Sequence, residues 1–230
     1  MTTVAVIGAN GYVGKALYDA LVQLPQYSVT AVTRGNYAEM QKKSFDIVIN
    51  SAMPSARFKA KNDPAWDFAE TVSKTADILY SWKYTKFVQV STVSARCQLD
   101  TVYGRHKAAA EKLCDFGTNL IVRLGAMYSN DLSKGVLVDM MEGKKVFVDG
   151  DSRYCFASRD FVASWIATHL DRSGVVEIGG REAISLRDVA AHLGKTISFE
   201  GTLDHQEIEN SDPKLPLARD VLDFLDGWKR

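Results

Sequence analysis

A tyrosine and a lysine four residues apart, Tyr103 and Lys107, are the side chains of this sequence best suited to proton chemistry. The alanine-rich segment after them favours a helix, and residues four apart lie on one face of a helix. A phenol with a pKa of about 10 is a poor base at neutral pH, but a neighbouring cation favours its ionised form. We therefore expect Tyr103 to exchange a proton with a substrate hydroxyl or carbonyl group. The alternative is a chance pair on a solvated helix.

Two hydroxyl residues, Ser91 and Thr92, follow the apolar run at residues 87–90. Open α/β sheets bind ligands at the carboxyl ends of their strands, so a hydroxyl group here could hold the substrate oxygen beside Tyr103. We expect Thr92 to take this catalytic and substrate-binding role. The alternative is a hydroxyl group that only satisfies the local backbone.

A glycine-rich loop follows the first apolar run and opens the first expected helix. Its three glycines have the spacing of dinucleotide-binding loops, where they allow a tight turn, close approach to a pyrophosphate, and packing of helix against strand. Free N–H groups and the helix dipole then attract the phosphate charge. We expect this loop to bind a dinucleotide through Gly8, Asn10, Gly11, Tyr12, Val13 and Gly14. A turn without a ligand is the alternative.

The residues after the second apolar run, Thr33 and Arg34, bear on the choice of cofactor. Sites that prefer NAD usually place an acid here for the ribose hydroxyls, and this chain has none. The Arg34 guanidinium could instead pair with a 2′-phosphate, with a further hydroxyl donor from Thr33. The sequence therefore favours NADP over NAD, although a solvated loop arginine would look the same.

The elements that must position these residues alternate between strands and helices. Short apolar runs lie at residues 4–7, 29–32, 47–49, 87–90 and 120–122, and helical spacing appears at 15–24, 68–82 and 105–114. This alternation predicts an α/β fold with a doubly wound, Rossmann-like parallel sheet. The sequence pattern changes after residue 124, where glycines, acidic residues and turn signals become frequent. We expect a dinucleotide-binding region at 1–124 and a small substrate lobe at 125–230, whose late strand and helices return to the main fold, within one structural domain.

The region from residue 125 onward carries turn signals and three more helix candidates. The sequence Asp149-Gly150-Asp151 predicts a turn. Helical spacing recurs at 161–170, 186–193 and 217–228, and Ser185 with Asp188 forms a plausible cap for the second of these helices.

Composition excludes several classes of protein. The 230 residues are 46% hydrophobic, with 28 basic and 28 acidic side chains and no basic stripe, so nucleic-acid binding has no electrostatic support. The three cysteines lack a paired spacing and are expected to be reduced, and the four scattered histidines predict no metal site. No apolar run has the length of a membrane span or a signal peptide. We expect a cytoplasmic protein with a small-molecule ligand and no membrane partner.

The glycine loop, Ser91-Thr92 and the Tyr103–Lys107 pair together resemble the short-chain dehydrogenase/reductase superfamily, specifically its extended branch, the NAD-dependent epimerase/dehydratase family. The resemblance covers most of the chain. Its further family-like pieces are residues 46–52, Asp63-Pro64, residues 86–91, Arg123-Leu124, residues 147–153, and residues 177–180 followed by 185–193.

The resemblance implies an NAD(P)-dependent oxidoreductase or epimerase that acts on a hydroxyl or carbonyl compound, with nucleotide sugars as one candidate class. It implies that Tyr103 and Lys107 also contact the cofactor, with Lys107 on the nicotinamide ribose, and that Ser51 and Ala52 line it. Arg153, in an expected hairpin at 147–153, would bind a substrate diphosphate. A homodimer through helices 68–82 and 105–114 is also implied.

The chain departs from the family around the expected substrate pocket. It is shorter than family members between Thr92 and Tyr103 and between Tyr128 and Val146, and Ala126 stands where relatives often carry an asparagine that binds a substrate phosphate. Both shortened stretches contribute to the pocket in relatives. The alternative to an enzyme is therefore a non-catalytic NADP-binding protein whose occupancy regulates a partner.

Overall fold

A six-stranded sheet is the centre of the computed structural model, which describes residues 1–228. The strand order is β2-β1-β3-β4-β5-β9, and β1 pairs in parallel with both β2 and β3, as β3 does with β4. The predicted doubly wound sheet is therefore confirmed. The strands are β1 (Thr2–Ile7), β2 (Tyr27–Val32), β3 (Ser44–Asn50), β4 (Lys83–Thr92), β5 (Leu120–Leu124) and β9 (Gly174–Ile178).

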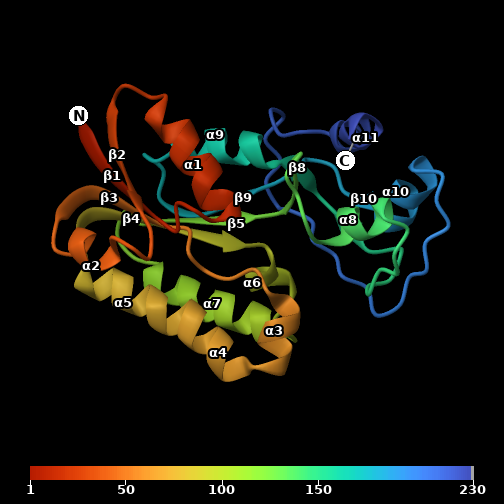
Figure 1. Cartoon of the computed structure of the whole chain (residues 1–230), viewed down its shortest axis with the longest axis horizontal. Helices are drawn as coiled ribbons and strands as arrows, with labels where there is room; N and C mark the ends of the chain where they lie inside the picture. Colours follow the sequence, from red (N-terminus) through yellow and green to blue (C-terminus); the bar gives the residue numbers. More distant parts are fainter. Residues whose placement is uncertain (229–230) are drawn as a thin grey trace. The chain divides into compact units, whose positions relative to one another are not determined.

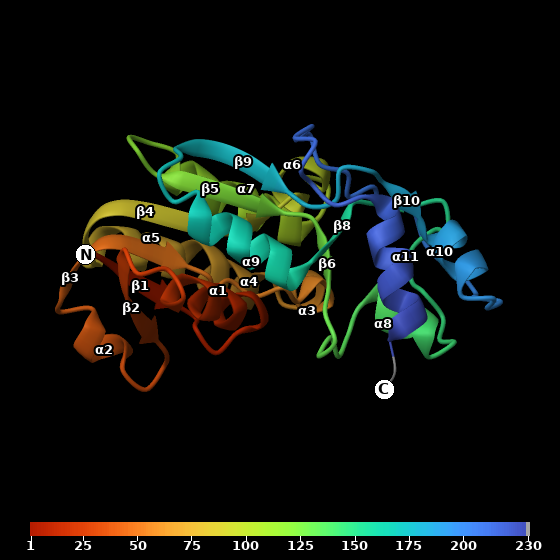
Figure 2. The same cartoon turned by 90° about the horizontal axis from the view of Figure 1, so that it is seen from above.

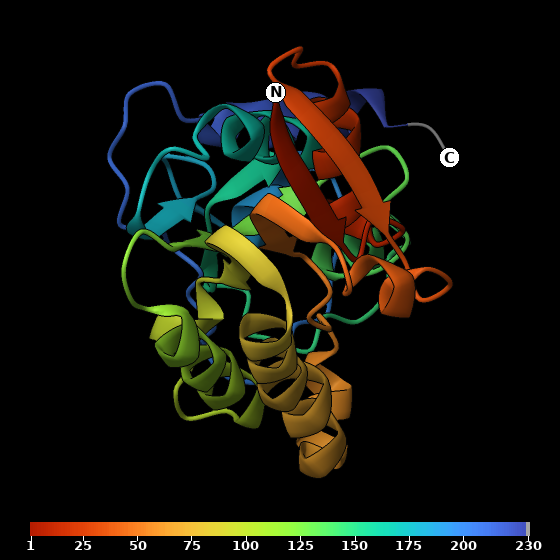
Figure 3. The ribbon, with the colours of Figure 1, turned by 90° about the vertical axis from the view of Figure 1, so that its left-hand side faces the viewer.

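Helices cover both faces of this sheet (Figures 1 and 3). α1 (Tyr12–Val22) and α9 (Arg159–Thr168) lie on one face, and Figure 2 shows them in front of the strands. α5 (Lys74–Ser81) and α7 (Val102–Cys114) lie on the other, while the short α2 (Tyr37–Met40) lies between β2 and β3 along the chain. Buried side chains between α5, α7 and the sheet, such as Ile78 and Phe87, form an apolar core. Burial on both faces explains why the central strands are continuous apolar runs.

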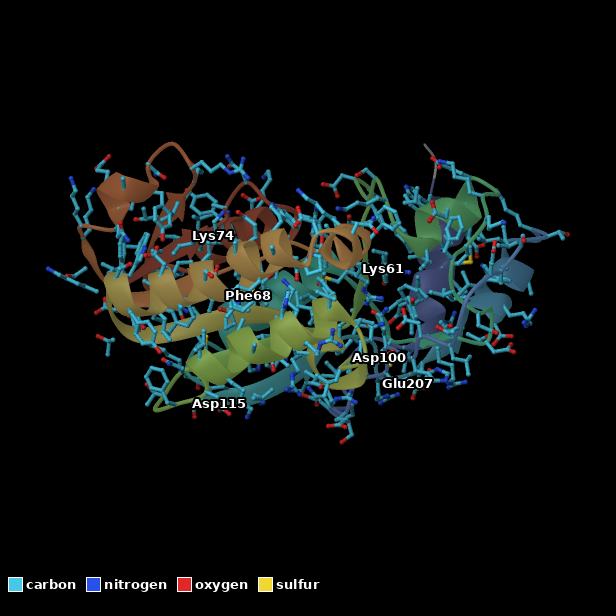
Figure 4. All side chains as sticks on the ribbon, turned by 90° about the horizontal axis from the view of Figure 1, so that it is seen from below. Lys61, Phe68, Lys74, Asp100, Asp115 and Glu207 are labelled. Atoms are coloured by element: carbon cyan, nitrogen blue, oxygen red, sulfur yellow. The ribbon has the colours of Figure 1, made fainter. Side chains whose placement is uncertain are left out.

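The helices before β4 are a short separate helix and, after a break at Asp63, a nearly continuous rod. α3 (Arg57–Asn62) is followed by α4 (Pro64–Phe68), a π-helical turn at Ala69–Ser73, and α5. Asp63 caps α4 by accepting a hydrogen bond from the Trp66 N–H at 3.0 Å, with Pro64 in the first turn. Figure 4 shows this rod side by side with α7, with Phe68 and Lys74 labelled on the rod. The side chains of the two helices can therefore meet at their shared face.

The chain divides into two compact units. The first comprises Met1–Arg123 and Asp160–Val176, and the second comprises Leu124–Arg159 and the chain from Glu177 onward. Residues 160–176, which follow the expected boundary at 124/125, thus belong to the unit that carries the glycine loop.

The second unit has short strands and its own apolar core. β6 (Ala126–Tyr128) pairs in parallel with β8 (Phe156–Ser158), and β7 (Arg153–Tyr154) pairs antiparallel with β10 (Ile184–Ser185). Buried residues of α8 (Val136–Met141), α10 (Leu186–His192) and α11 (Ala218–Gly227) share one apolar cluster with Tyr154 and Phe156. No helix within residues 1–228 is long and apolar enough to cross a membrane.

Two local expectations in the second unit have different outcomes. The cap of α10 is confirmed, since Ser185 Oγ accepts a hydrogen bond from the Asp188 N–H at 3.0 Å. The expected hairpin at 147–153 is wrong: Asp149 does form the turn, accepting from the N–H groups of Asp151 and Ser152, but β7 pairs with the distant β10. The pairing of two strands so far apart in sequence leaves no pattern in the residues around either strand.

Candidate active site and cofactor site

The structure brings Tyr103 and Thr92 together at the carboxyl end of β4. Tyr103 lies in the first turn of α7 and is 7% exposed, and its phenol lies beside the Thr92 hydroxyl group, which acts on its ionisation. Burial raises the pKa of Tyr103 to about 12; the Arg57 charge and the Thr92 hydroxyl group act in the opposite direction, while the charge of Asp67 adds to the rise. The phenol is therefore protonated at neutral pH and is placed to donate a proton.

Lys107 lies one turn further along α7, on the same face as Tyr103. Its Nζ is 5.0 Å from the centre of the Tyr103 ring and donates a hydrogen bond to the Pro54 carbonyl at 2.8 Å. The side chain is 2% exposed, and burial lowers the pKa of Lys107 to about 7 against the opposing effect of Asp67. Near neutral pH this amine can thus be either charged or neutral.

The neighbouring hydroxyl, Ser91, faces a different environment. Its Oγ donates to Glu111 Oε1 at 2.6 Å, and Glu111 also accepts hydrogen bonds from the Arg123 guanidinium, at 2.7 Å for the closest. This buried arrangement of Ser91, Glu111 and Arg123 ties α7 to β4 and β5. Of the two strand-end hydroxyl groups, only Thr92 contacts Tyr103.

Sequence reasoning missed charged residues that surround the Tyr103–Lys107 face. Arg57, in the first turn of α3, lies with its guanidinium carbon 5.7 Å from the centre of the Tyr103 ring and donates to Ser94 Oγ at 2.9 Å. Asp67, in α4, is fully buried, and its Oδ2 is 2.8 Å from His106 Nδ1. Arg57 and Asp67 follow a loop without regular spacing, so no sequence signal placed either residue near Tyr103.

The glycine loop has the local geometry that close approach of a ligand requires. Gly8 has a φ of 86°, in the left-handed region that favours glycine, and a Cβ there would lie 2.9 Å from Ala52 Cα. A Cβ on Gly14 would lie 2.1 Å from the Gly8 carbonyl oxygen, which explains the third glycine. Gly11 caps α1 without a capping side chain, so the helix begins at Tyr12 and Val13 with its N-terminal dipole facing the loop.

Thr33 and Arg34 follow β2 beside this loop along the sheet, because β1 and β2 are paired in register from Thr2–Tyr27 to Ile7–Val32. The Thr33 N–H donates to Asn36 Oδ1 at 2.7 Å, and Asn36 in turn donates to the Ala31 carbonyl at 2.9 Å. Asn36, which sequence reasoning also missed, therefore fixes the turn. Arg34 is exposed on it.

Ser51 and Ala52 follow β3 and lie against the glycine loop. The Ser51 N–H donates to the Ile7 carbonyl at 2.9 Å, and the Ala52 N–H donates to Asn50 Oδ1 at 3.2 Å. Ser51 Oγ is buried and has no hydrogen-bond partner within residues 1–228. An orphaned hydroxyl group beside the Gly8 turn and an uncapped helix N-terminus fit a dinucleotide with its hydroxyl and phosphate groups.

Arg153 belongs to the second unit, whereas the other candidate residues belong to the first. Its Nε donates to Glu207 Oε1 at 3.0 Å, and its terminal nitrogen donates to the Ala183 carbonyl at 3.1 Å. About half of the Arg153 side chain is exposed, at 49%. An anion could therefore reach Arg153, in competition with Glu207.

Comparison with solved structures finds the same fold in several proteins. The chain resembles RMD from Pseudomonas aeruginosa complexed with NADPH (17% identity, TM-score 0.70, covering 100% of this chain and 93% of that one). It resembles UDP-glucose 4-epimerase from Thermotoga maritima with UDP-glucose (16%, 0.73, 98% and 97%). It also resembles dTDP-4-dehydrorhamnose reductase from Bacillus anthracis in complex with NADP (15%, 0.74, 100% and 100%). No curated protein sequence matches the chain.

The sequence itself also matches a family model over residues 4–130, described as the NAD dependent epimerase/dehydratase family. The matched region contains the glycine loop, Thr92, Tyr103 and Lys107. Because it spans more than half of the 230 residues, the chain belongs to the NAD-dependent epimerase/dehydratase family.

Proposed function

We propose that this protein is an NADP-preferring oxidoreductase of a carbonyl or hydroxyl compound, in which Tyr103 donates and accepts the proton. The observation that carries the proposal is the buried Tyr103 phenol, which lies beside the Thr92 hydroxyl group and whose ring centre is 5.0 Å from Lys107 Nζ. The bound nicotinamide would supply the hydride-transfer chemistry. The site's own residues then need to place one substrate oxygen and move one proton.

In the direction of carbonyl reduction, the Tyr103 O–H bond breaks and its proton moves to the substrate oxygen. The raised pKa of Tyr103, about 12, keeps the phenol in the protonated form that this donor role requires at neutral pH. Thr92 holds the same oxygen through its hydroxyl group, and Lys107 contributes positive charge beside the phenol when it is protonated. Epimerisation or dehydration would use the same proton transfer between Tyr103 and the substrate.

Ser51 and the glycine loop would hold the cofactor, and Arg34 would discriminate in favour of the 2′-phosphate. The loop N–H groups of Tyr12 and Val13 suit the pyrophosphate, and the orphaned Ser51 hydroxyl can donate to the ligand. Thr33 and Ala52 lie at the same edge of the sheet and complete the surface that we assign to the cofactor.

Nucleotide sugars are the substrate class that we place first. UDP-glucose is named with one structural neighbour, and a dTDP-sugar reductase is another. In this chain, Arg153 is the residue that we assign to the diphosphate. Free nucleoside diphosphates should then compete with substrate, and Arg153→Ala should weaken substrate binding while leaving cofactor affinity intact. An active enzyme that millimolar UDP and dTDP fail to inhibit would remove nucleotide sugars from consideration.

The decisive experiment is single-turnover NADPH oxidation across a panel of carbonyl and sugar-nucleotide substrates. Tyr103→Phe keeps the ring and its packing but removes the ionisable oxygen, so turnover should fall by about 10² to 10⁴-fold with little change in cofactor affinity. Tyr84→Phe is the matched control, because its phenol donates to the Leu79 carbonyl on another part of the first unit. If Tyr103→Phe matches wild type in rate, another group moves the proton. No turnover with any substrate, combined with tight NADP binding, would support the regulatory alternative.

A further inference from the structure

Arg57 brings a positive charge to Tyr103 from outside its own helix. The guanidinium carbon lies 5.7 Å from the centre of the Tyr103 ring, a distance at which a cation interacts with an aromatic face. One terminal nitrogen donates to Ser94 Oγ at 2.9 Å, and Ser94 is fully buried and also accepts from the Thr92 hydroxyl at 3.3 Å. Arg57 is therefore joined through Ser94 to Thr92, which contacts Tyr103.

Donation of a proton leaves a buried phenolate on Tyr103, and both positive and negative charges surround that phenolate. The groups that act on it are Arg57 from α3, Asp67 from α4, Lys107 from α7 and Thr92 from β4. Asp67 is fully buried and opposes a second negative charge. Without a permanent cation nearby, burial of the phenolate would be costly.

Lys107 is poorly suited to act alone as that cation. Burial lowers the pKa of Lys107 to about 7, so much of its charge is absent above neutral pH, and its Nζ donates to the Pro54 carbonyl. An arginine, in contrast, stays charged throughout the working pH range and presents a planar group that packs over aromatic rings. The Arg57 charge also lowers the pKa of Tyr103, second in size only to the opposing effect of burial.

We propose that Arg57 is a positioning residue of this site, whose guanidinium, held by Ser94 beside the Tyr103 ring, stabilises the phenolate that remains after Tyr103 has given up its proton. The proposal rests on the proposed acid/base role of Tyr103. The Tyr103–Lys107 spacing alone would place all of the proton chemistry on α7. The proposal gives α3, through Arg57, a part in it as well.

The test measures ionisation of Tyr103 directly, without substrate or cofactor. The full-length protein is prepared with fluorinated tyrosine, whose phenol is more acidic than that of tyrosine, so that the titration falls within a range in which the protein stays folded. The Tyr103 signal in the ¹⁹F spectrum is identified by its loss in Tyr103→Phe. Its pH midpoint is then compared between wild type and variants.

Arg57→Met should decrease the acid dissociation constant of Tyr103 by about tenfold or more, the effect expected from loss of an opposite charge at this distance. Arg57→Lys should recover most of that loss. Arg105→Met is the matched control, because Arg105 is exposed on α7, the helix that carries Tyr103, and donates to the carbonyls of Leu99 and Asp100. It should leave the midpoint unchanged.

An unchanged Tyr103 midpoint in folded Arg57→Met would overturn the proposal. If Arg57→Met does not fold, Ser94→Ala decides: loss of the Ser94 anchor should decrease the same dissociation constant, and an unchanged midpoint overturns the proposal there too. In the active enzyme, Arg57→Met should lower kcat with little change in KM. If Tyr103→Phe turns out to be fully active, the proposed function fails, while the titration still reports whether Arg57 stabilises the phenolate.

Discussion

Burial of an amine at Lys107 makes stability depend on pH. The folded pKa of Lys107 is about 7, and the reference value for the unfolded chain is 10.5. Between these values the unfolded chain binds a proton that the folded chain does not, so the free energy of unfolding rises with pH across this window. Below about pH 7 both states hold the proton, and the penalty of burying the charge is fully present.

Lys107→Met removes this titration and should flatten the pH dependence. The free energy of unfolding of wild type should gain about 2 to 3 kcal/mol relative to Lys107→Met between pH 7 and pH 9, at about 1.4 kcal/mol per pH unit. Chemical denaturation of both proteins across this range measures the difference. Lys112→Met is the control, since its side chain on the same helix is 81% exposed. Parallel profiles for wild type and Lys107→Met would show that folding does not lower the pKa of Lys107.

The Asp67–His106 contact should matter for stability. Asp67 Oδ2 has His106 as its partner, and Oδ1 is buried without a hydrogen bond within residues 1–228. His106→Leu leaves both oxygens without a partner and should lower the free energy of unfolding by roughly 1 to 3 kcal/mol. The double variant Asp67→Leu/His106→Leu should recover much of this loss, because no buried polar group is then orphaned. Equal losses in the single and double variants would contradict this explanation.

Arg34 should set the preference between the two nicotinamide cofactors. A charge-assisted contact with the 2′-phosphate contributes about 1.5 to 3 kcal/mol, so Arg34→Ala should weaken NADP binding by roughly ten- to a hundredfold and leave NAD binding nearly unchanged. Calorimetry with both cofactors measures this. Lys43→Ala removes a surface charge that is paired with Glu39 and serves as the control. Equal affinities that Arg34→Ala does not alter would refute the NADP preference.

At the residue scale, sequence predicts contacts that a regular element enforces and misses those that depend on tertiary structure. Tyr103 and Lys107 meet because one helix carries both at the right spacing, and Thr92 follows from the end of a strand. Arg57 and Asp67 reach Tyr103 only because α3 and α4 pack against α7. Their types and spacing are those of ordinary surface residues, so only the structure identifies them.

The junction between α6 (Ser94–Cys97) and α7 holds Tyr103 in place, and Gly104 lies where the two helices pack closely together. A Cβ on Gly104 would lie 2.0 Å from the Gln98 carbonyl oxygen and 2.7 Å from that of Ser94. Thr101 caps the same turn by accepting from the Gly104 N–H at 2.9 Å. No other residue type fits without moving one of the two helices.

Gly104→Ala should therefore destabilise the protein by about 1 to 3 kcal/mol, the usual cost of overpacking. It should also shift the Tyr103 ionisation, because the first turn of α7 must move. Gly227→Ala is the control, as nothing lies within 4 Å of its added Cβ. Denaturation midpoints of the two variants decide the matter, and a Gly104→Ala protein as stable as wild type would show that the junction relaxes freely.

At the element scale, sequence locates the cores of strands and helices better than their ends. β4 runs from Lys83 to Thr92, whereas its apolar run covers only residues 87–90. Residues 83–86 are exposed or half-exposed, so burial places no constraint on their polarity. The same cause hides α3 and α4, which are short and partly exposed. Pairing of β7 with β10 joins segments 30 residues apart in sequence and leaves no periodic signal.

At the scale of the whole molecule, the chain leaves its first unit after Arg123, returns for residues 160–176, and leaves again. The predicted sheet needs this return, because β9 is its sixth strand and α9 covers one face. The sequence predicts that a late strand and helices return to the main fold, but composition alone does not place the return at residues 160–176, since α9 and β9 resemble any other helix and strand.

The division into two units predicts where a bound cofactor stabilises the chain. The glycine loop, Arg34, Tyr103 and Lys107 all lie in the first unit. NADP at about a hundred times its Kd adds roughly 2.7 kcal/mol to any opening that destroys its site, which slows hydrogen exchange through that opening by about a hundredfold. Peptides from β1, β3 and β4 should therefore gain protection, and peptides from α8, α10 and α11 should gain much less. Hydrogen exchange measured by mass spectrometry, with and without NADP, tests this directly. Equal slowing in both sets of peptides would mean that the two units open together, and then a local cofactor site would stabilise the entire chain.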